Sequence, residues 1–115
     1  TAADTIHKFA LKAQILQFYD YGLAFAALKA GQVYAFVTDN GILAGILRDS
    51  SGYKLVGGNF TNQPYGIAVN KGQTQMCDHI NQALTKLEKD GTYNRLVKKW
   101  FGNIPGMNIK EIEKH

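Results

Sequence analysis

Hydrophobic and polar positions form two kinds of pattern along this chain. Apolar residues recur every three or four positions, which is the spacing of one helical face, over five stretches: residues 1–12, 20–30, 39–49, 76–87 and 92–100. Short runs rich in apolar, β-branched and aromatic residues are typical of buried strands, and four of them lie between these stretches: residues 13–18, 33–37, 53–56 and 65–69. Helix and strand alternate up to residue 56, which predicts a parallel α/β layer.

Helix start and stop signals support the first two helices. Thr1 and Asp4 form a capping pattern that satisfies amide donors of a first turn. Asp20 is expected to cap the second helix, and Gly31 provides a residue that takes the left-handed conformation at its end.

After Lys71-Gly72 the pattern changes to helices alone. One helix is expected to carry an apolar stripe formed by Met76, Ile80, Ala83, Leu84 and Leu87. Asp90-Gly91-Thr92 then separates it from a last helix, which should bury four side chains: Tyr93, Leu96, Val97 and Trp100. From Gly102 the chain is polar and mixed, so we expect a surface strap with a frayed end.

Composition limits the classes of protein to consider. The 115 residues suffice for one domain, and a hydrophobic content of 45% excludes a disordered chain. The net charge of +4 is spread along the sequence, about +1 in residues 1–70 and +3 in residues 71–115, so it does not indicate a nucleic-acid partner. We expect the lysines of the last two predicted helices to form a solvent-exposed face.

Few residues offer catalytic or metal chemistry. Cys77 is the one cysteine, which excludes an internal disulfide and a cysteine-built zinc site, and we expect it in the core or at its boundary. The three histidines are far apart in sequence, and no serine or cysteine follows a nucleophile motif. No metal, cofactor or enzymatic activity is therefore expected.

Asp39 is the most informative single residue. It stands where an apolar strand is predicted to end and a helix to begin, which is the crevice position for ligands in open α/β sheets. Its carboxylate could accept hydrogen bonds from an ammonium group, with the hydroxyl of Thr38 beside it. An equally open alternative is that Asp39 only caps the third helix.

A second candidate is the start of the first helix. The backbone N–H groups of Thr1, Ala2 and Ala3 would suit an anion such as a carboxylate, although every helix has such an end. Together with Asp39, this start would suit a zwitterion such as a free amino acid.

Four segments, in the right order, resemble the polar-amino-acid-binding proteins of ABC importers, bacterial extracellular solute-binding family 3. They cover nearly the whole chain. The segments are 90–102 (DGTYNRLVKKWFG), 64–69 (PYGIAV) followed by 71–72 (KG), 26–33 (AALKAGQV) with 37–39 (VTD), and 1–4 (TAAD). Two positions depart from the family pattern: Tyr34 stands where an acidic residue is usual, and Leu23 replaces a commonly polar one.

The resemblance implies the periplasmic-binding-protein fold, in which two α/β lobes close over an amino acid. Residues 1–63 would be a second-lobe segment without its first strand, residues 64–72 a hinge strand, and residues 73–115 the last two helices and tail of the first lobe. Asp39 would hold the ligand α-ammonium, the region of Thr1 and Ala2 its α-carboxylate, and Thr38 would lie beside its side chain.

The resemblance also implies a function and a location. The chain would belong to the substrate-binding component of an ABC importer for a polar or charged amino acid of the glutamine, glutamate or arginine type. It would act with a membrane permease and without a cofactor. It would be periplasmic, or lipid-anchored outside a Gram-positive cell. The alternative is the ligand-binding domain of a sensor or receptor of the same fold.

Relatives of this family are about twice as long, so the chain resembles a carboxy-terminal fragment. The absent first strand would lie between residues 13–18 and 33–37, leaving strand edges and apolar faces uncovered. We therefore expect a domain-swapped dimer, association with another copy or with the missing part, and weak amino-acid binding by this chain alone.

Overall fold

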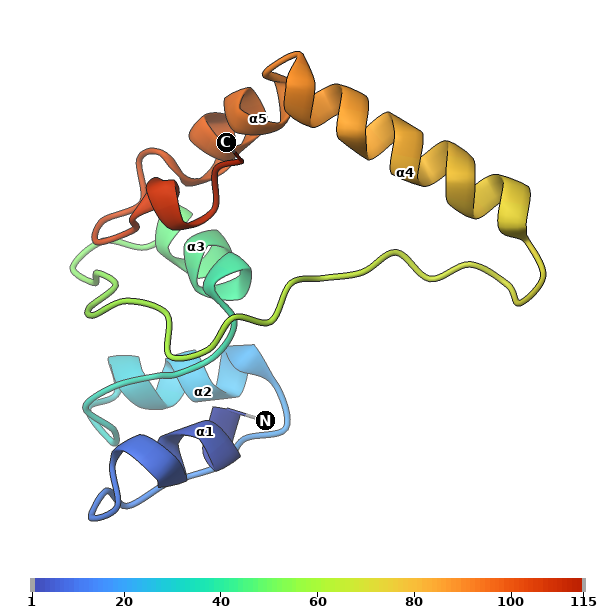
Figure 1. Ribbon diagram of the computed structural model, residues 1–115. Helices are drawn as coiled ribbons and strands as arrows, with labels where there is room; N and C mark the ends of the chain where they lie inside the picture. The colour runs from blue at the N-terminus through green and yellow to red at the C-terminus, as the bar shows by residue number, and fades with distance from the viewer. Residues whose placement is uncertain (1, 115) are drawn as a thin grey trace. The chain divides into compact units, whose positions relative to one another are not determined.

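The computed structural model describes residues 2–114 and is helical (Figure 1). In chain order the elements are α1 (Ala2–Phe9), α2 (Tyr21–Lys29), α3 (Asn40–Arg48), α4 (Thr74–Lys89), α5 (Thr92–Phe101) and the short 3₁₀ helix η1 (Ile109–Glu111). The chain divides into two compact units, residues 1–43 and 44–115, with the boundary inside α3.

In the first unit, α1 and α2 confirm the first two predicted helices. α1 ends at Phe9, three residues earlier than expected, and none of its residues is buried. Asp20 caps α2 as predicted, because its Oδ1 accepts a hydrogen bond from the Leu23 N–H at 2.8 Å. Gly31 follows α2 with φ 74°, in the left-handed region. The predicted capping role of Thr1 falls outside the described residues.

The core of the second unit forms between α3 and the chain that follows α5. Ala44 and Leu47 of α3 are buried with Ile104. Four half-buried side chains pack against this cluster: Tyr53, Leu55, Phe101 and Met107. The expectation of a surface strap after Gly102 is therefore wrong, because Ile104 belongs to the core.

The described part of the tail is held by α5 as far as Lys114. The Asn94 side-chain amide donates to the Lys114 carbonyl at 2.7 Å, and its Oδ1 accepts from the Lys114 N–H at 2.8 Å. The Asn94 side chain thus pairs with both the backbone N–H and the backbone carbonyl of Lys114. The ammonium of Lys114 also lies 5.9 Å from the centre of the Tyr93 ring. These contacts fix the segment around η1 to α5.

α4 and α5 confirm the two predicted carboxy-terminal helices, with the separation at Asp90 and Gly91. Gly91 has φ 81°, and Asp90 Oδ1 accepts a hydrogen bond from the Thr92 N–H at 2.9 Å. Burial is less extensive than expected. Of the four α5 residues predicted to face inward, only Val97 is buried. Trp100, for example, is 47% exposed. Cys77 is exposed, not a core residue, because no residue of α4 is buried.

None of the four predicted strands is formed within residues 2–114. A strand is stable only when its backbone N–H and C=O groups pair with a neighbour. One backbone hydrogen bond of this kind is present at residues 53–56, from Leu55 N–H to the Pro105 carbonyl at 2.9 Å. Residues 65–69 are exposed, with Tyr65 at 81%. The predicted sheet is thus not confirmed, and the division at residues 63 and 72 stays a prediction.

Candidate functional site

Asp39 lies immediately before α3 and is exposed. Its backbone carbonyl accepts hydrogen bonds from the N–H groups of Ile42 and Leu43, both at 3.1 Å, and so begins the hydrogen-bond ladder of the helix. Phe36, Val37 and Thr38, which precede it, are half-buried. The segment is therefore anchored through its side chains while Asp39 stays accessible to solvent, as a ligand-binding carboxylate must be.

Thr38 is half-buried and Asp39 is exposed, so the two side chains suit different contacts with a ligand. The half-buried hydroxyl of Thr38 is a neutral donor and acceptor, suited to orienting a polar group. The carboxylate of Asp39 accepts hydrogen bonds and carries charge, so it suits an ammonium group. The predicted chemistry of this pair is thus compatible with its position.

Ala2 is the first residue of α1 and is half-buried. Thr1, the other predicted residue of the carboxylate site, lies outside the described residues. Asp4 stands in the first turn of α1, where its negative charge offsets the positive end of the helix dipole. This carboxylate reduces the attraction of the helix start for a ligand anion, an effect that the sequence prediction did not weigh.

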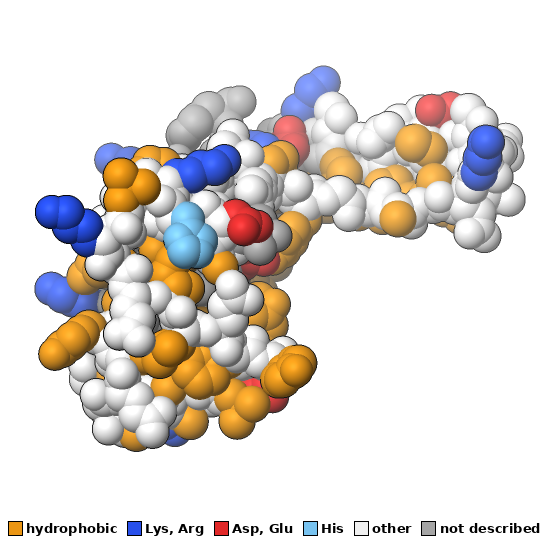
Figure 2. Space-filling view, turned by 90° about the horizontal axis from the view of Figure 1, so that it is seen from below, with side chains coloured by type: hydrophobic (Ala, Val, Ile, Leu, Met, Phe, Trp, Pro, Cys, Tyr) orange, Lys and Arg blue, Asp and Glu red, His pale blue; other side chains and the backbone are white. Residues whose placement is uncertain are grey.

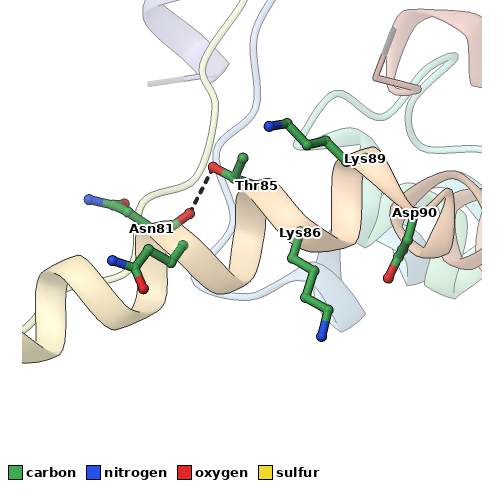
Figure 3. Close-up of a pocket in the computed structure, with 6 residues that line it drawn as sticks. Asn81, Thr85, Lys86, Lys89 and Asp90 are labelled. Atoms are coloured by element: carbon green, nitrogen blue, oxygen red, sulfur yellow. Dashed lines mark hydrogen bonds between the residues drawn. The ribbon is translucent and has the colours of Figure 1, made fainter.

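Surface depressions lie elsewhere. One lies along the carboxy-terminal half of α4, lined by Asn81, Gln82, Thr85, Lys86, Lys89 and Asp90 (Figure 3). Its lining comes from successive turns of α4 and from the Asp90 that follows, so it is an open surface depression and not an enclosed cavity. Within it the Thr85 hydroxyl donates to the Asn81 carbonyl at 2.9 Å. Another is lined by residues 58–62 and Glu111. Neither includes Ala2, Thr38 or Asp39.

Within residues 2–114 no group of three or more histidine, cysteine or acidic side chains is placed to hold a metal ion. In the same range, none of the helices has the length and hydrophobicity needed to cross a membrane.

One contact in the second unit was not foreseen from the sequence. The Arg48 guanidinium donates to the Trp100 carbonyl at 2.9 Å and lies 4.7 Å from the centre of the Trp100 ring. Lys99 lies 5.3 Å from the same ring. Arg48 and Trp100 are 52 positions apart in the sequence, and no local sequence pattern predicts that they are in contact. The contact ties the end of α3 to the end of α5, which is a structural role.

Comparison with known proteins connects the chain to one family. Residues 7–103 match the family model of bacterial extracellular solute-binding proteins, family 3. The ABC transporter glutamine-binding protein of Bacillus subtilis is 44% identical over 105 residues, covering 91% of this chain and 38% of that protein. The glutamine-binding protein of Geobacillus stearothermophilus is 39% identical over 80 residues, covering 70% and 30%. A glutamate-binding protein of Corynebacterium efficiens is 37% identical over 94 residues, covering 76% and 32%.

The chain spans about a third of the length of these curated relatives. No solved structure gives a significant match. The family and the relatives are binding proteins and not enzymes, in agreement with the prediction from the sequence. The family match over residues 7–103, with 44% identity across nine-tenths of the chain, shows that this protein belongs to the bacterial extracellular solute-binding proteins, family 3.

Proposed function

We propose that this chain is part of the substrate-binding component of an amino-acid ABC importer, and that Asp39 binds the α-ammonium group of the ligand. The observation that carries the proposal is the exposed carboxylate of Asp39 at the start of α3, inside the region that matches the family. Thr38 would contact the ligand side chain. Thr1 and Ala2 would lie near its α-carboxylate.

The physical chemistry of Asp39 supports this role. A carboxylate accepts up to four hydrogen bonds and an ammonium group donates three, so charge and hydrogen-bonding capacity match. The half-buried residues Phe36, Val37 and Thr38 hold the backbone next to Asp39 in place.

Glutamine is the ligand that we propose first. The Bacillus subtilis and Geobacillus stearothermophilus relatives, at 44% and 39% identity, are both named as glutamine-binding proteins. The amide of glutamine is neutral and needs only polar partners, such as the Thr38 hydroxyl. Glutamate, named for the Corynebacterium efficiens relative, is the next candidate.

The partner would be a membrane permease of an ABC transporter, and the chain would act outside the cytoplasmic membrane, periplasmic or lipid-anchored. The name of the Bacillus subtilis relative, which includes the words ABC transporter, supports import over a sensor or receptor role. The extracellular description of the family supports the location.

An NMR titration of the ¹⁵N-labelled chain with glutamine tests the assignment of Asp39. We expect weak, millimolar binding with amide shift changes at residues 38–41, because a chain this short supplies only part of a two-lobed site. Asp39→Asn should abolish these changes. The matched control is Asp49→Asn, which removes an exposed carboxylate just after the other end of α3. Shift changes that persist in the Asp39 variant, or that vanish equally in both variants, would contradict the assignment.

A further inference from the structure

We propose that Asn40 is a site of spontaneous covalent modification, at which the chain converts its own asparagine into a mixture of aspartate and isoaspartate through a cyclic imide with Gly41. The reacting group is the side-chain amide of Asn40, and the co-reactant is water. The proposal concerns the backbone at the start of α3 and is independent of the ligand-binding role proposed above.

Asn40 is followed by glycine, which sets it apart from the other asparagines of the sequence. The imide forms when the backbone nitrogen of the next residue approaches Cγ of the asparagine, and a side chain on that residue hinders the approach. Glycine has no Cβ and the widest choice of backbone angles, so it hinders least. Of the eight asparagines, the other seven precede Phe60, Gln63, Lys71, Gln82, Arg95, Ile104 and Ile109.

The amide of Gly41 lies outside the hydrogen-bond ladder of α3. Asn40 and Gly41 are the first two residues of the helix, and N–H groups of a first turn have no acceptor within the helix. The ladder begins with the N–H groups of Ile42 and Leu43, which donate to the Asp39 carbonyl, both at 3.1 Å. The reaction therefore requires only the first turn to open, and helix ends open most easily.

The conversion needs no oxidant or catalyst. The Gly41 nitrogen attacks Cγ of Asn40, so an N–Cγ bond forms, the Cγ–Nδ2 bond breaks, and the proton of the Gly41 amide leaves with Nδ2 as ammonia. Water then opens the imide at either carbonyl, which gives aspartate or isoaspartate. Asn40 and Gly41 are half-buried and so in contact with solvent. Figure 2 shows backbone and uncharged polar side chains, drawn in white, exposed across the face that it draws.

The other pair of this kind in the sequence, Asp90-Gly91, has its reacting groups engaged. The Gly91 N–H donates to the Glu88 carbonyl at 3.4 Å. The Asp90 Oδ1 accepts a hydrogen bond from the Thr92 N–H at 2.9 Å. We therefore expect isoaspartate at position 40 and none at position 90 in the folded chain.

The two products have different effects on α3. Isoaspartate inserts an extra methylene into the main chain at residue 40, and both hydrogen bonds to the Asp39 carbonyl span that residue. These bonds are then lost, so the helix begins later. Aspartate keeps the normal backbone, and its charge is favourable at a helix start. Either product lowers the net charge from +4 to +3.

Peptide mapping by mass spectrometry tests the proposal on the whole 115-residue chain, incubated folded in a mildly alkaline buffer. Trypsin cleaves after Lys29 and Arg48 and releases residues 30–48, in which Asn40 is the one asparagine. We expect this peptide to be replaced by two later products, each heavier by the difference between a hydroxyl and an amino group. Protein isoaspartyl methyltransferase should methylate one of them. The rate should rise with pH, because the attacking nitrogen must lose its proton.

Gly41→Ala should slow the conversion several-fold, because its Cβ hinders the attack. The folded chain accepts this Cβ, since nothing lies within 4 Å of its position. The matched control is Gly45→Ala in the same helix, where the Cβ position is equally open. It adds the same helix propensity without changing the neighbour of Asn40, so the conversion should keep its natural rate. Circular dichroism of each variant checks that the helices remain.

The natural chain unfolded in guanidinium chloride keeps the test decisive if Gly41→Ala fails to fold. Conversion in the unfolded chain with none in the folded chain would overturn the proposal, because the start of α3 would then protect Asn40. So would aspartate as the sole product, which indicates direct hydrolysis without an imide. Equal rates in the natural chain and in a folded Gly41→Ala variant, or faster formation of isoaspartate at position 90, would overturn it as well.

Discussion

Gly106 carries a constraint that only its backbone reveals. Its φ of 81° lies in the left-handed region, and a Cβ built on it would collide with the carbonyl of Leu55. That close approach accompanies the hydrogen bond from the Leu55 N–H to the Pro105 carbonyl. A side chain at position 106 would therefore separate the two segments that flank the core of the second unit.

Gly106→Ala is expected to lower the free energy of unfolding by about 2–4 kcal/mol, combining backbone strain with loss of this approach. Gly52→Ala is the matched control, since Gly52 has φ 86° and open space around its Cβ position. It should cost only about 1 kcal/mol from backbone strain. Urea denaturation of both variants gives the comparison. Equal losses would show that the contact with Leu55 contributes nothing.

Local signals explain which elements could be predicted. Helices depend on hydrogen bonds and capping within a few residues, so the Asp20 cap and the glycines at 31 and 91 marked helix boundaries correctly. Strands depend on partners distant in the chain, and no strand forms at residues 33–37 or 65–69 within residues 2–114. The burial of Ile104 and the Arg48–Trp100 contact also depend on segments that are distant in the chain. Local sequence patterns do not predict such contacts. At the site, the sequence indicated that Asp39 precedes a helix, while its ligand remains a proposal.

The cap of α2 provides a test at the level of one element. Asp20→Ala leaves the Leu23 N–H without its acceptor and should lower stability by about 1 kcal/mol. Asp20→Ser restores a capping oxygen and should recover most of the loss. Thermal unfolding followed by circular dichroism measures both. Similar losses in the two variants would mean that the carboxylate acts in another way than as a cap.

The junction of α4 and α5 predicts a dependence of stability on pH. Hydrogen bonds from the side chain and backbone N–H of Thr92 lower the pKa of the Asp90 carboxyl below its ordinary value. A carboxyl whose pKa is depressed on folding stabilises the fold above its unfolded pKa, and that contribution is lost as pH falls through the folded pKa.

Between pH 5 and pH 3 the free energy of unfolding should therefore fall more in the natural protein than in Asp90→Asn. Asp49→Asn removes an exposed carboxylate elsewhere in the second unit and should keep the natural acid response. Urea denaturation across this pH range measures the free energy of unfolding of the natural protein and of both variants. An Asp90→Asn variant with undiminished acid sensitivity would contradict the assignment.

At the scale of the molecule, family membership and the state of the isolated chain are separate questions. The chain matches the family over residues 7–103 but spans about a third of the length of its relatives. In the described residues it buries only six hydrophobic side chains: Ala24, Ala27, Ala44, Leu47, Val97 and Ile104. A small core with much exposed apolar surface is consistent with association, and with a ligand site that one chain of this length completes only in part.

The most direct measurement of the central claim is calorimetry on a chimera. Residues 7–103 would replace the matched segment of the Bacillus subtilis glutamine-binding protein, with the unmodified relative as reference. We predict that the chimera binds glutamine, that Asp39→Asn reduces its affinity at least about 100-fold through loss of a charge-assisted contact, and that Asp49→Asn does not. A folded chimera that binds no glutamine, glutamate or other polar amino acid, or that binds equally well without the Asp39 carboxylate, would contradict the account.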